Sequence, residues 1–291
     1  MELRCPWPVR CVAHCVTQRF SLCGDCASAQ LATRSIQDYQ NPKKMKSHKF
    51  TDYTYLEIKD LIEAGCLAIV PTGCTEQQGP HLPVDFDTWF AEAVALEAAQ
   101  HAARCHDVRA LVLPATPFGP TPEHRGFGSG YVNIPHVVHE AYVYFVLESL
   151  AEQGFGTIVV WRGCGEHRLQ EAVDRFNAKF QPGCKVCLPP LPYHDIWCRV
   201  ADPSVPGGHA DSFTTSIAMY QRPATVRIES IPSSRSREVD WNDPHLDFTE
   251  YSDTGVIGDA TRASAELGRR LWDEVISTTA AIFRDAIELS E

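Results

Sequence analysis

Three carboxylates, one imidazole and one thiol fall within a single short stretch of the chain, residues 70–87. Two of the carboxylates are Glu76 and Asp87, and Gly79 between them permits a sharp backbone turn. An apolar run at 66–70 leads into the stretch, and a helical pattern that begins near Asp87 leads out of it. Such a strand–loop–helix passage places polar side chains where open α/β sheets usually hold ligands. Because carboxylates are hard oxygen donors, we interpret the stretch as half of a metal site. The alternative is a capped loop, with Asp87 as the helix cap and Glu76 solvated.

Other polar groups follow three further strand-like segments, which end near Pro114, Trp161 and Leu188. In a parallel sheet the carboxyl ends of the strands lie at one edge, so these loops are expected to converge on one crevice. A divalent ion held there could activate water and polarise a carbonyl, while an imidazole moves the proton. The pattern favours metal-assisted hydrolysis, and ordinary loop polarity is the alternative. The groups concerned are Glu76, Gln78, His81, Asp87, Glu123, His124, Cys164, Glu166, His167, His194, Asp195 and His209.

Thiol chemistry is a second interpretation of the same loops. Cys74 or Cys164, with a nearby histidine, could form a thiolate pair. Cys164, however, lies between two glycines and close to Glu166. The negative charge of Glu166 would raise the pKa of a thiol unless a metal ion were present.

From Tyr55 onward, short apolar runs alternate with longer amphipathic segments. Strands are expected at 66–70, 110–114, 157–161 and 184–188, with a possible edge strand at 224–231. Helices are expected near 55–64, 87–106, 134–153, 168–180, 211–220 and 263–289. This alternation is typical of βαβ units, and it predicts an α/β fold with a mostly parallel sheet and helices on both faces.

The first 49 residues differ from the rest and are predicted to form a disordered, cysteine-rich extension. Cys23 and Cys26 have the spacing of a zinc-binding pair, but no second pair matches them, so a zinc knuckle is the alternative. Met45 could be the natural start of the protein. Residues 50–291 show neither an internal repeat nor a linker and are predicted to be one domain.

The composition narrows the class of partner. The chain has 291 residues, of which 44% are hydrophobic, and a formal net charge of −11, which is ample for a full core. The acidic balance argues against a nucleic-acid partner. The longest apolar runs fall far below the roughly 20 residues that a membrane helix needs. No secretory signal pattern is visible, so a soluble cytoplasmic protein without a disulfide framework is expected.

Five blocks of the sequence, in order, resemble the signatures of the creatininase (creatinine amidohydrolase) family. The first, E-Q-Q-G-P-H-L-P at 76–83 followed by Asp87, resembles the family's E-Q-H-G-P-H-L-P…D. The last, G-V-I-G-D at 255–259, resembles the family's C-terminal G-V-x-G-D. The middle blocks are weaker on their own. They are Glu123-His124, Arg162-Gly163-Cys164-Gly165-Glu166 and Gly208-His209-Ala210.

The resemblance implies a three-layer α/β/α sandwich with a mostly parallel central sheet, a homohexamer, and metal-dependent hydrolysis of C–N bonds in small cyclic or linear amides. In the family, two metal ions share a bridging aspartate. By position, Glu76 matches a first-metal carboxylate, Asp87 the bridging aspartate and Glu166 a second-metal carboxylate. His209 matches the histidine that assists proton transfer, so His209 and Glu166 are the expected catalytic residues.

Two positions depart from the family's metal-ligand pattern. Gln78 and Cys164 each stand where the family has a histidine. The glutamine offers only a weak neutral oxygen, so the second metal position should lose affinity, whereas a thiolate is a good zinc or iron ligand. We therefore expect one or two divalent ions, zinc or manganese with iron as the alternative. The expected ligands are Glu76, Gln78, Asp87, Cys164 and Glu166.

Three residues beside these motifs are assigned to substrate binding. Arg162 brings a fixed cation near the site and could hold an anionic substrate; an ion pair with a neighbouring acid is the alternative. His124 could contact substrate or be an ordinary loop histidine. His81 is expected to orient the loop or a ligand through hydrogen bonds. Tyr193 and Trp197 could form the walls of a pocket for a planar substrate.

Three functional hypotheses follow. The first is a divergent amidohydrolase with a small-molecule amide substrate. The second is a biosynthetic hydrolase or lyase that uses Cys164 as a ligand or nucleophile. The third is a metal-free binding or assembly subunit. All three fit a homo-oligomer that binds neither nucleic acid nor membrane.

Overall fold

The structure, a computed structural model, describes residues 45–165, 167–205, 207–233, 236–241, 243 and 245–288. The chain divides into two compact units, Met1–Asn41 and Pro42–Glu291, and every described residue belongs to the second. The extension predicted for the N-terminus lies outside the described residues up to residue 44. Residues 45–49, which the sequence pattern places in that extension, contact the sheet. Lys49 forms a parallel bridge with Val112, and the Val112 amide donates to the His48 carbonyl at 2.7 Å.

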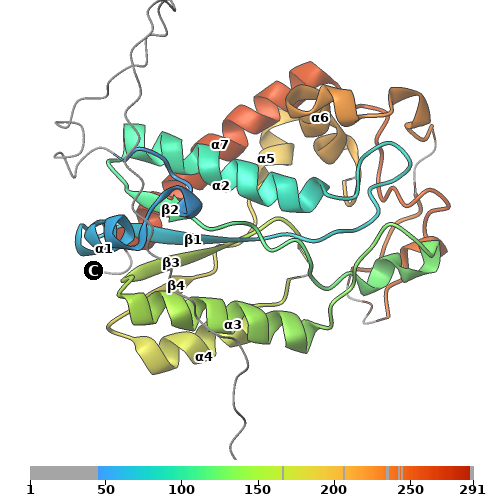
Figure 1. Cartoon of the computed structure of the whole chain (residues 1–291). Coiled ribbons are helices and arrows are strands. Elements are labelled where there is room, and N and C mark those ends of the chain that lie inside the picture. Colours follow the sequence, from blue (N-terminus) through green and yellow to red (C-terminus); the bar gives the residue numbers. More distant parts are fainter. Residues whose placement is uncertain are drawn as a thin grey trace, which may run out of the picture. The chain divides into compact units, whose positions relative to one another are not determined.

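A four-stranded sheet forms the centre of this unit (Figure 1). Its strands lie in the order β2-β1-β3-β4, and every neighbouring pair is parallel. Thr72 at the end of β1 is in register with Arg162 at the end of β3, so the loops that follow both central strands start side by side. The strands are β1 (Leu67–Thr72), β2 (Ala110–Val112), β3 (Thr157–Arg162) and β4 (Lys185–Cys187).

Helices cover both faces of the sheet (Figure 1). Leu67 and Ile69 of β1 pack into a core with one group of helices, whereas Ala68 and Val70 pack into a second core on the opposite face. The first group comprises α2 (Phe86–Cys105), α5 (Tyr193–Val200), α6 (Ser212–Gln221) and α7 (Ala265–Glu288). The second comprises α1 (Tyr55–Glu63), α3 (His136–Gln153) and α4 (Gln170–Phe180). The predicted three-layer α/β/α architecture with a parallel sheet is confirmed.

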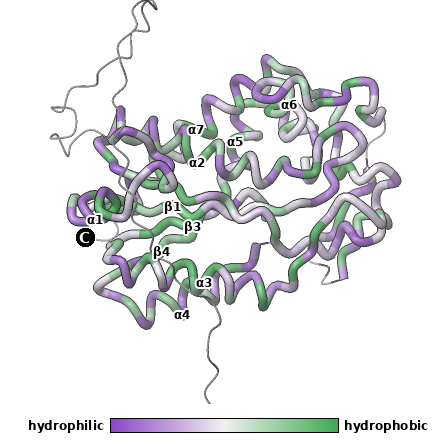
Figure 2. Tube along the Cα trace, viewed as in Figure 1, coloured by the Kyte–Doolittle hydropathy of each residue, from purple (hydrophilic) through white to green (hydrophobic). Residues whose placement is uncertain are grey.

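The hydropathy of the chain follows these layers. Figure 2 shows hydrophobic stretches along the strands and hydrophilic residues on the outward sides of the helices. Among the residues that the structure describes, no helix combines the length and the apolarity that a membrane crossing requires.

Two segments differ from the sequence-based expectation. The stretch after β4, expected to be a loop, contains α5, because Ile196 and Trp197 turn inward and are buried in the core. The expected edge strand at 224–231 is instead two 3-10 turns, Pro223–Thr225 and Ile228–Ser230. Proline at the start of the first turn has no amide hydrogen to give to a strand partner, and Ile228 is 61% exposed rather than buried on a sheet face.

A substitution at Gly268 in α7 would test how closely α6 and α7 pack against each other. A β-carbon at this position would collide with the carbonyl oxygen of Ser216 in α6. Gly268→Ala should therefore lower the free energy of unfolding by about 1–3 kcal/mol, although alanine favours a helix interior. Urea denaturation would measure the loss. Gly156→Ala is the matched control, because a β-carbon there meets nothing within 4 Å; an equal loss in both variants would contradict the close approach of α6 and α7.

Candidate active site

The loop after β1 carries three side chains of the site on one side. Cys74, Glu76 and Gln78 stand at alternate positions, and in an extended chain such positions face the same way. All three are buried, with Glu76 only 2% exposed. Gly79 then adopts a φ of +65° and the chain folds back through a bridge between Gln78 and Leu82. The idea of a plain capped loop with a solvated Glu76 is therefore wrong.

The loop after β3 closes onto the first turn of α2. Gly163 donates its amide hydrogen to the Thr72 carbonyl at 2.7 Å, and a β-carbon at Gly163 would collide with the carbonyl oxygen of Asp87. Only glycine fits this approach. As a result Cys164, the next residue, lies beside Asp87, the second residue of α2.

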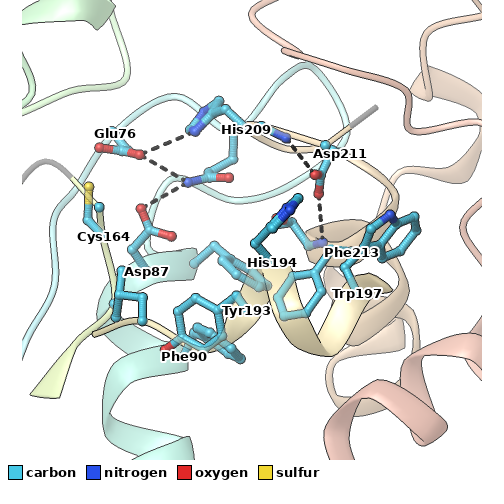
Figure 3. A pocket seen from close by; sticks show the side chains of 18 of the residues that line it. Glu76, Asp87, Phe90, Cys164, Tyr193, His194, Trp197, His209, Asp211 and Phe213 are labelled. Atoms are coloured by element: carbon cyan, nitrogen blue, oxygen red, sulfur yellow. Dashed lines mark hydrogen bonds and ion pairs between the residues drawn. The ribbon is translucent and has the colours of Figure 1, made fainter. Parts of the chain in front are cut away.

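Four acidic groups meet at this point. Cys74 Sγ donates to Glu76 Oε2 at 3.0 Å and to Asp87 Oδ2 at 3.2 Å. The Sγ of Cys164 joins them, so that one ligand atom from each of the four residues lies within 4.8 Å of every other. Gln78 Nε2 faces both carboxylates, 3.4 Å from Glu76 Oε1 and 3.2 Å from Asp87 Oδ2. Figure 3 shows Glu76, Asp87 and Cys164 pointing toward one another at one end of a cavity.

The two carboxylates differ in protonation although they are neighbours. Burial alone would raise the pKa of Glu76, but the positive charge of His124 and its interaction with the carboxylate outweigh burial and hold that pKa well below its ordinary value. Burial and the negative charge of Glu76 raise the pKa of Asp87. Without a cation, Glu76 is therefore the stronger acid of the two, and Asp87 is the one that more readily holds a proton.

Both thiols are also held in the protonated form. Burial, followed by the neighbouring Cys164 and Glu76, raises the pKa of Cys74. For Cys164 the hydrogen bond from Cys74 acts to lower the pKa, but burial and the carboxylates raise it to about 12 overall. Within the described part of the chain, no histidine donates to or accepts from either thiol.

His124 supports Glu76 from the η3 turn (Pro122–Phe127). Its Nε2 lies 3.4 Å from Glu76 Oε2 and 3.3 Å from Glu123 Oε1. Burial opposes a charge on the ring, but the two carboxylates outweigh it and raise the pKa of His124. Gln77 lies on the other side of the ring: its Nε2 is 3.0 Å from Nδ1 of His124, and its Oε1 accepts from the Gly79 amide at 2.9 Å. The Nε2 side of His124 therefore faces the carboxylates.

His209 places an unprotonated nitrogen at the same point. Its Nε2 donates to the Gln77 carbonyl at 2.6 Å, which leaves Nδ1 as an acceptor 3.4 Å from Glu76 Oε1. Burial and the neighbouring His124 lower the pKa of His209 to about 4, so the ring is neutral at pH 7. A pair of backbone hydrogen bonds with Ile257 holds the His209 loop, and Asp211 two residues later caps α6.

A cavity of about 760 Å³ opens from these groups. Figure 3 shows Phe90, Tyr193, Trp197 and Phe213 along its wall, with Asp211 at the far end from Cys164. Trp241 and Phe248 complete the aromatic lining. Among the described residues that line the cavity there is no lysine or arginine, whereas four are acidic. The acidic residues are Glu76, Asp87, Glu123 and Asp211.

Comparison with known proteins identifies the family. The family described as creatininase, creatinine amidohydrolase, matches residues 51–283. This chain belongs to the creatininase family.

Two curated relatives carry the name mycofactocin precursor peptide peptidase. The protein from Mycobacterium tuberculosis is 30% identical over 221 residues, which is 72% of this chain and 80% of the relative. The protein from Mycolicibacterium smegmatis is 28% identical over 214 residues, which is 72% of this chain and 81% of the relative.

Solved creatininase structures share the fold. One, named "Creatininase Mn", superposes with a TM-score of 0.72 at 21% identity and covers 82% of this chain and 98% of its own. A mutant creatininase of "Zn-Zn type" gives a TM-score of 0.70 at 22% identity, with 83% and 98% covered.

The structure brings together most of the residues that the creatininase motifs indicated. Glu76, Gln78, Asp87, Cys164 and His209 all line the cavity. His124 lies behind Glu76 and contacts its carboxylate rather than lining the cavity. Glu166 lies outside the described residues, so its predicted roles as second-metal ligand and catalytic residue stay predictions.

Two predicted substrate contacts lie elsewhere. Arg162 does not line the cavity; its guanidinium donates to the carbonyls of Pro189 at 3.1 Å and His167 at 3.5 Å. His81 is fully buried, and its Nε2 donates to Thr215 Oγ1 at 2.8 Å. His81 thus ties the motif loop to α6, which agrees with an orienting role and not with substrate contact.

Sequence reasoning missed the parts played by Cys74 and Gln77. Cys74 was considered only as a nucleophile, although its position two residues before Glu76 in an extended segment already indicated that both face the same way. Gln77 holds both histidines of the site, through its side chain and its carbonyl. No spacing rule points to it, because its partners lie 47 and 132 positions away.

The residues present fit a divalent cation. Two carboxylates and two thiols packed together in a buried corner are a set of potential anions whose charges a cation would neutralise. The Oε1 of Gln78 is buried and has no hydrogen-bond partner among the described residues. Glu76 also forms a second group with ring nitrogens of His124 and His209, all within 4.8 Å, so the expectation of one or two ions has two candidate positions.

Proposed function

We propose that this creatininase-family protein is a metal-dependent amidohydrolase that cleaves the C–N bond of an amide with water. The observation that supports the proposal is the cluster of Cys74, Glu76, Asp87 and Cys164, which adjoins the neutral ring of His209 at one end of the cavity. A divalent ion bound by this cluster would lower the pKa of a water molecule and polarise the amide carbonyl.

His209 is the residue that moves the proton. Its Nδ1 is unprotonated because Nε2 is committed to the Gln77 carbonyl, so Nδ1 can accept the proton of the attacking water. The same nitrogen can return this proton to the leaving amine as the C–N bond breaks. His124 and Gln77 position these groups. His124 faces the Glu76 carboxylate, and Gln77 contacts His124 through its side chain and His209 through its carbonyl.

The cavity indicates the charge and shape of the substrate. Its described lining contains four acidic residues and no lysine or arginine, so a neutral or positively charged amide fits better than the anionic substrate that Arg162 suggested. Aromatic side chains on several elements offer flat faces on which a planar amide or ring can stack.

A peptide amide is the second candidate substrate. A volume of about 760 Å³ lies toward the upper end of the roughly 300–1,000 Å³ of ligand pockets, which leaves room for more than one small ring. The curated relatives named above are peptidases of a precursor peptide. Small lactams, linear amides and short peptides are therefore the classes to assay side by side.

A nucleophilic role for Cys164 has less support. Burial and the carboxylates keep both thiols protonated, and the described histidines form no hydrogen bond with them. A thiol without a base is a weak nucleophile at neutral pH. We therefore assign Cys164 to metal binding.

We also propose that the protein assembles with copies of itself. Val138, Tyr142 and Phe145 of α3 are each more than half exposed, and these residues recur at helical spacing. Large apolar side chains grouped in this way mark a protein–protein contact surface. The homohexamer that the family resemblance suggests stays a prediction.

Removal of metal is the first test of the function. Protein dialysed against a chelator should lose hydrolysis of its best amide substrate, and added zinc or manganese should restore it, because water is not activated without the ion. Elemental analysis of the same samples reports the ion per chain. Full hydrolysis by protein that elemental analysis shows to be free of metal would contradict the proposal and favour the metal-free or thiol-based alternatives.

His209→Asn tests the proton-transfer role. The variant should lower kcat by about 10²–10⁴-fold while the metal content stays at the wild-type level, since Nδ1 serves as a base. His101→Asn, in α2 far along the helix from Asp87, is the control and should leave kcat unchanged. A loss of bound metal in His209→Asn would show instead that His209 is a ligand.

A further inference from the structure

We propose that the metal ion of this site is bound by two sulfur atoms, from Cys74 and Cys164, together with carboxylate oxygens of Glu76 and Asp87. The centre would then select zinc over manganese. The inference rests on the proposed function, because it concerns the ion that hydrolysis requires. It adds a ligand, Cys74, that lies two residues before the family motif.

Cys74 has the geometry of a ligand rather than of a packing residue. Its side chain is fully buried, and its sulfur is in contact with one oxygen of each carboxylate, at 3.0 and 3.2 Å. A cysteine that only fills space lies among apolar atoms. Cys184 is an example from this chain: it is 3% exposed and packs in the hydrophobic core beneath the sheet.

The spacing of the four ligand atoms suits one ion. In a tetrahedral zinc site, metal–ligand bonds of about 2.0–2.3 Å separate neighbouring ligand atoms by roughly 3.3–3.8 Å. Here the contacts of Cys74 Sγ with the two carboxylates, at 3.0 and 3.2 Å, are slightly shorter than this range, and no pair of ligand atoms is more than 4.8 Å apart. Small side-chain movements would therefore let one ion replace the thiol protons that now link these groups.

The carboxylates are better partners for the two sulfurs than the nearby His167. A ring nitrogen of His167 also lies within 4.8 Å of both thiols. However, Nδ1 of this ring is hydrogen-bonded to Thr72 Oγ1 at 2.9 Å, and Nε2 lies against Gly119 without a hydrogen-bond partner among the described residues. His167 does not line the cavity that a substrate would enter, whereas Glu76, Asp87 and Cys164 do.

Two sulfur ligands would change which metal the site prefers. Thiolates favour zinc and other softer ions, whereas carboxylates, amides and water suit manganese. The replacement of a motif histidine by Gln78 removes a nitrogen donor from the family pattern, and Cys74 and Cys164 supply sulfur in its vicinity. The residues at these positions therefore favour a metal site in which sulfur replaces nitrogen as a ligand, rather than a site that has lost its metal.

Cobalt substitution tests the two-sulfur centre directly. The full-length protein would be stripped of metal, loaded with Co²⁺ and examined for sulfur-to-cobalt charge-transfer absorption in the near ultraviolet. We expect wild-type protein to show a strong band, Cys74→Ser and Cys164→Ser about half its intensity per bound cobalt, and the double variant none. Cys184→Ser is the matched control for replacing a buried cysteine, and a variant with both Cys23 and Cys26 replaced by serine accounts for any cobalt bound by that pair.

Competition between metals provides a second measurement. Cys74→Ser should reduce the preference for zinc over manganese by at least about tenfold. The variant loses a sulfur ligand, and zinc favours sulfur more strongly than manganese does. An unchanged band and an unchanged preference in Cys74→Ser, with cobalt still bound, would overturn the inference and leave the proposed function intact. Failure of the wild-type protein to bind any divalent ion would overturn both.

Zinc-edge X-ray absorption of the wild-type protein avoids reliance on variants that fold poorly. The control here is the variant without Cys23 and Cys26, loaded with one zinc per chain. Two sulfur neighbours at about 2.3 Å, with oxygen or nitrogen making up the rest, are the expected result. One sulfur neighbour would exclude a two-sulfur centre, and none would exclude both cysteines as ligands.

Discussion

The burial of two carboxylates side by side is the constraint around which this active site is built. At the 4.8 Å or less that separates ligand atoms of Glu76 and Asp87, two full negative charges would repel by about 3.5 kcal/mol at an effective dielectric of 20. Hydrogen-bond donors reduce this repulsion. The thiol of Cys74 and the amide of Gln78 contact both carboxylates, and His124 faces Glu76. A divalent cation would remove the repulsion altogether, and the presence of a second thiol at the same point fits such an ion better than a purely structural network.

The fold explains why residues so distant in sequence meet there. β1 and β3 are parallel neighbours whose ends are in register, so the loops that carry Glu76 and Cys164 leave the sheet together. Gly163 allows the second loop to lie against the start of α2, which delivers Asp87. His209 arrives from the segment between α5 and α6 and is held by Ile257 and by the Gln77 carbonyl. The ring to which we assign proton transfer is thus held by the same loop that carries Glu76.

What could be predicted from the sequence was set by short-range patterns. The hydrophobic runs of β1 and β3 and the periodicity of α2 and α7 were visible, and with parallel strands they implied that polar loops would share an edge. The E-Q-Q-G-P-H-L-P motif then identified Glu76 and Asp87. Arg162 illustrates the limit: its place beside the motif suggested a substrate contact, but its guanidinium donates to the carbonyls of His167 and Pro189 and does not line the cavity.

The features that the sequence could not predict depend on contacts between residues far apart in the chain. The helix α5 forms because Ile196 and Trp197 find partners in the core, and no local signal reveals those partners. In the same way, the charge state of His209 depends on burial and on a carbonyl 132 positions away, and the cavity wall gathers aromatic residues from α2, α5, α6 and the C-terminal loops. These features arise only when separate segments pack together.

Anomalous X-ray diffraction tests the central claim most directly. Crystals grown with zinc would be measured on both sides of the zinc absorption edge, and the difference between the two data sets locates the ion without assumptions about its ligands. The account predicts a strong peak enclosed by Cys74, Glu76, Asp87 and Cys164. Well-ordered density in which these four side chains contact one another with no anomalous peak among them, at saturating zinc, would contradict it.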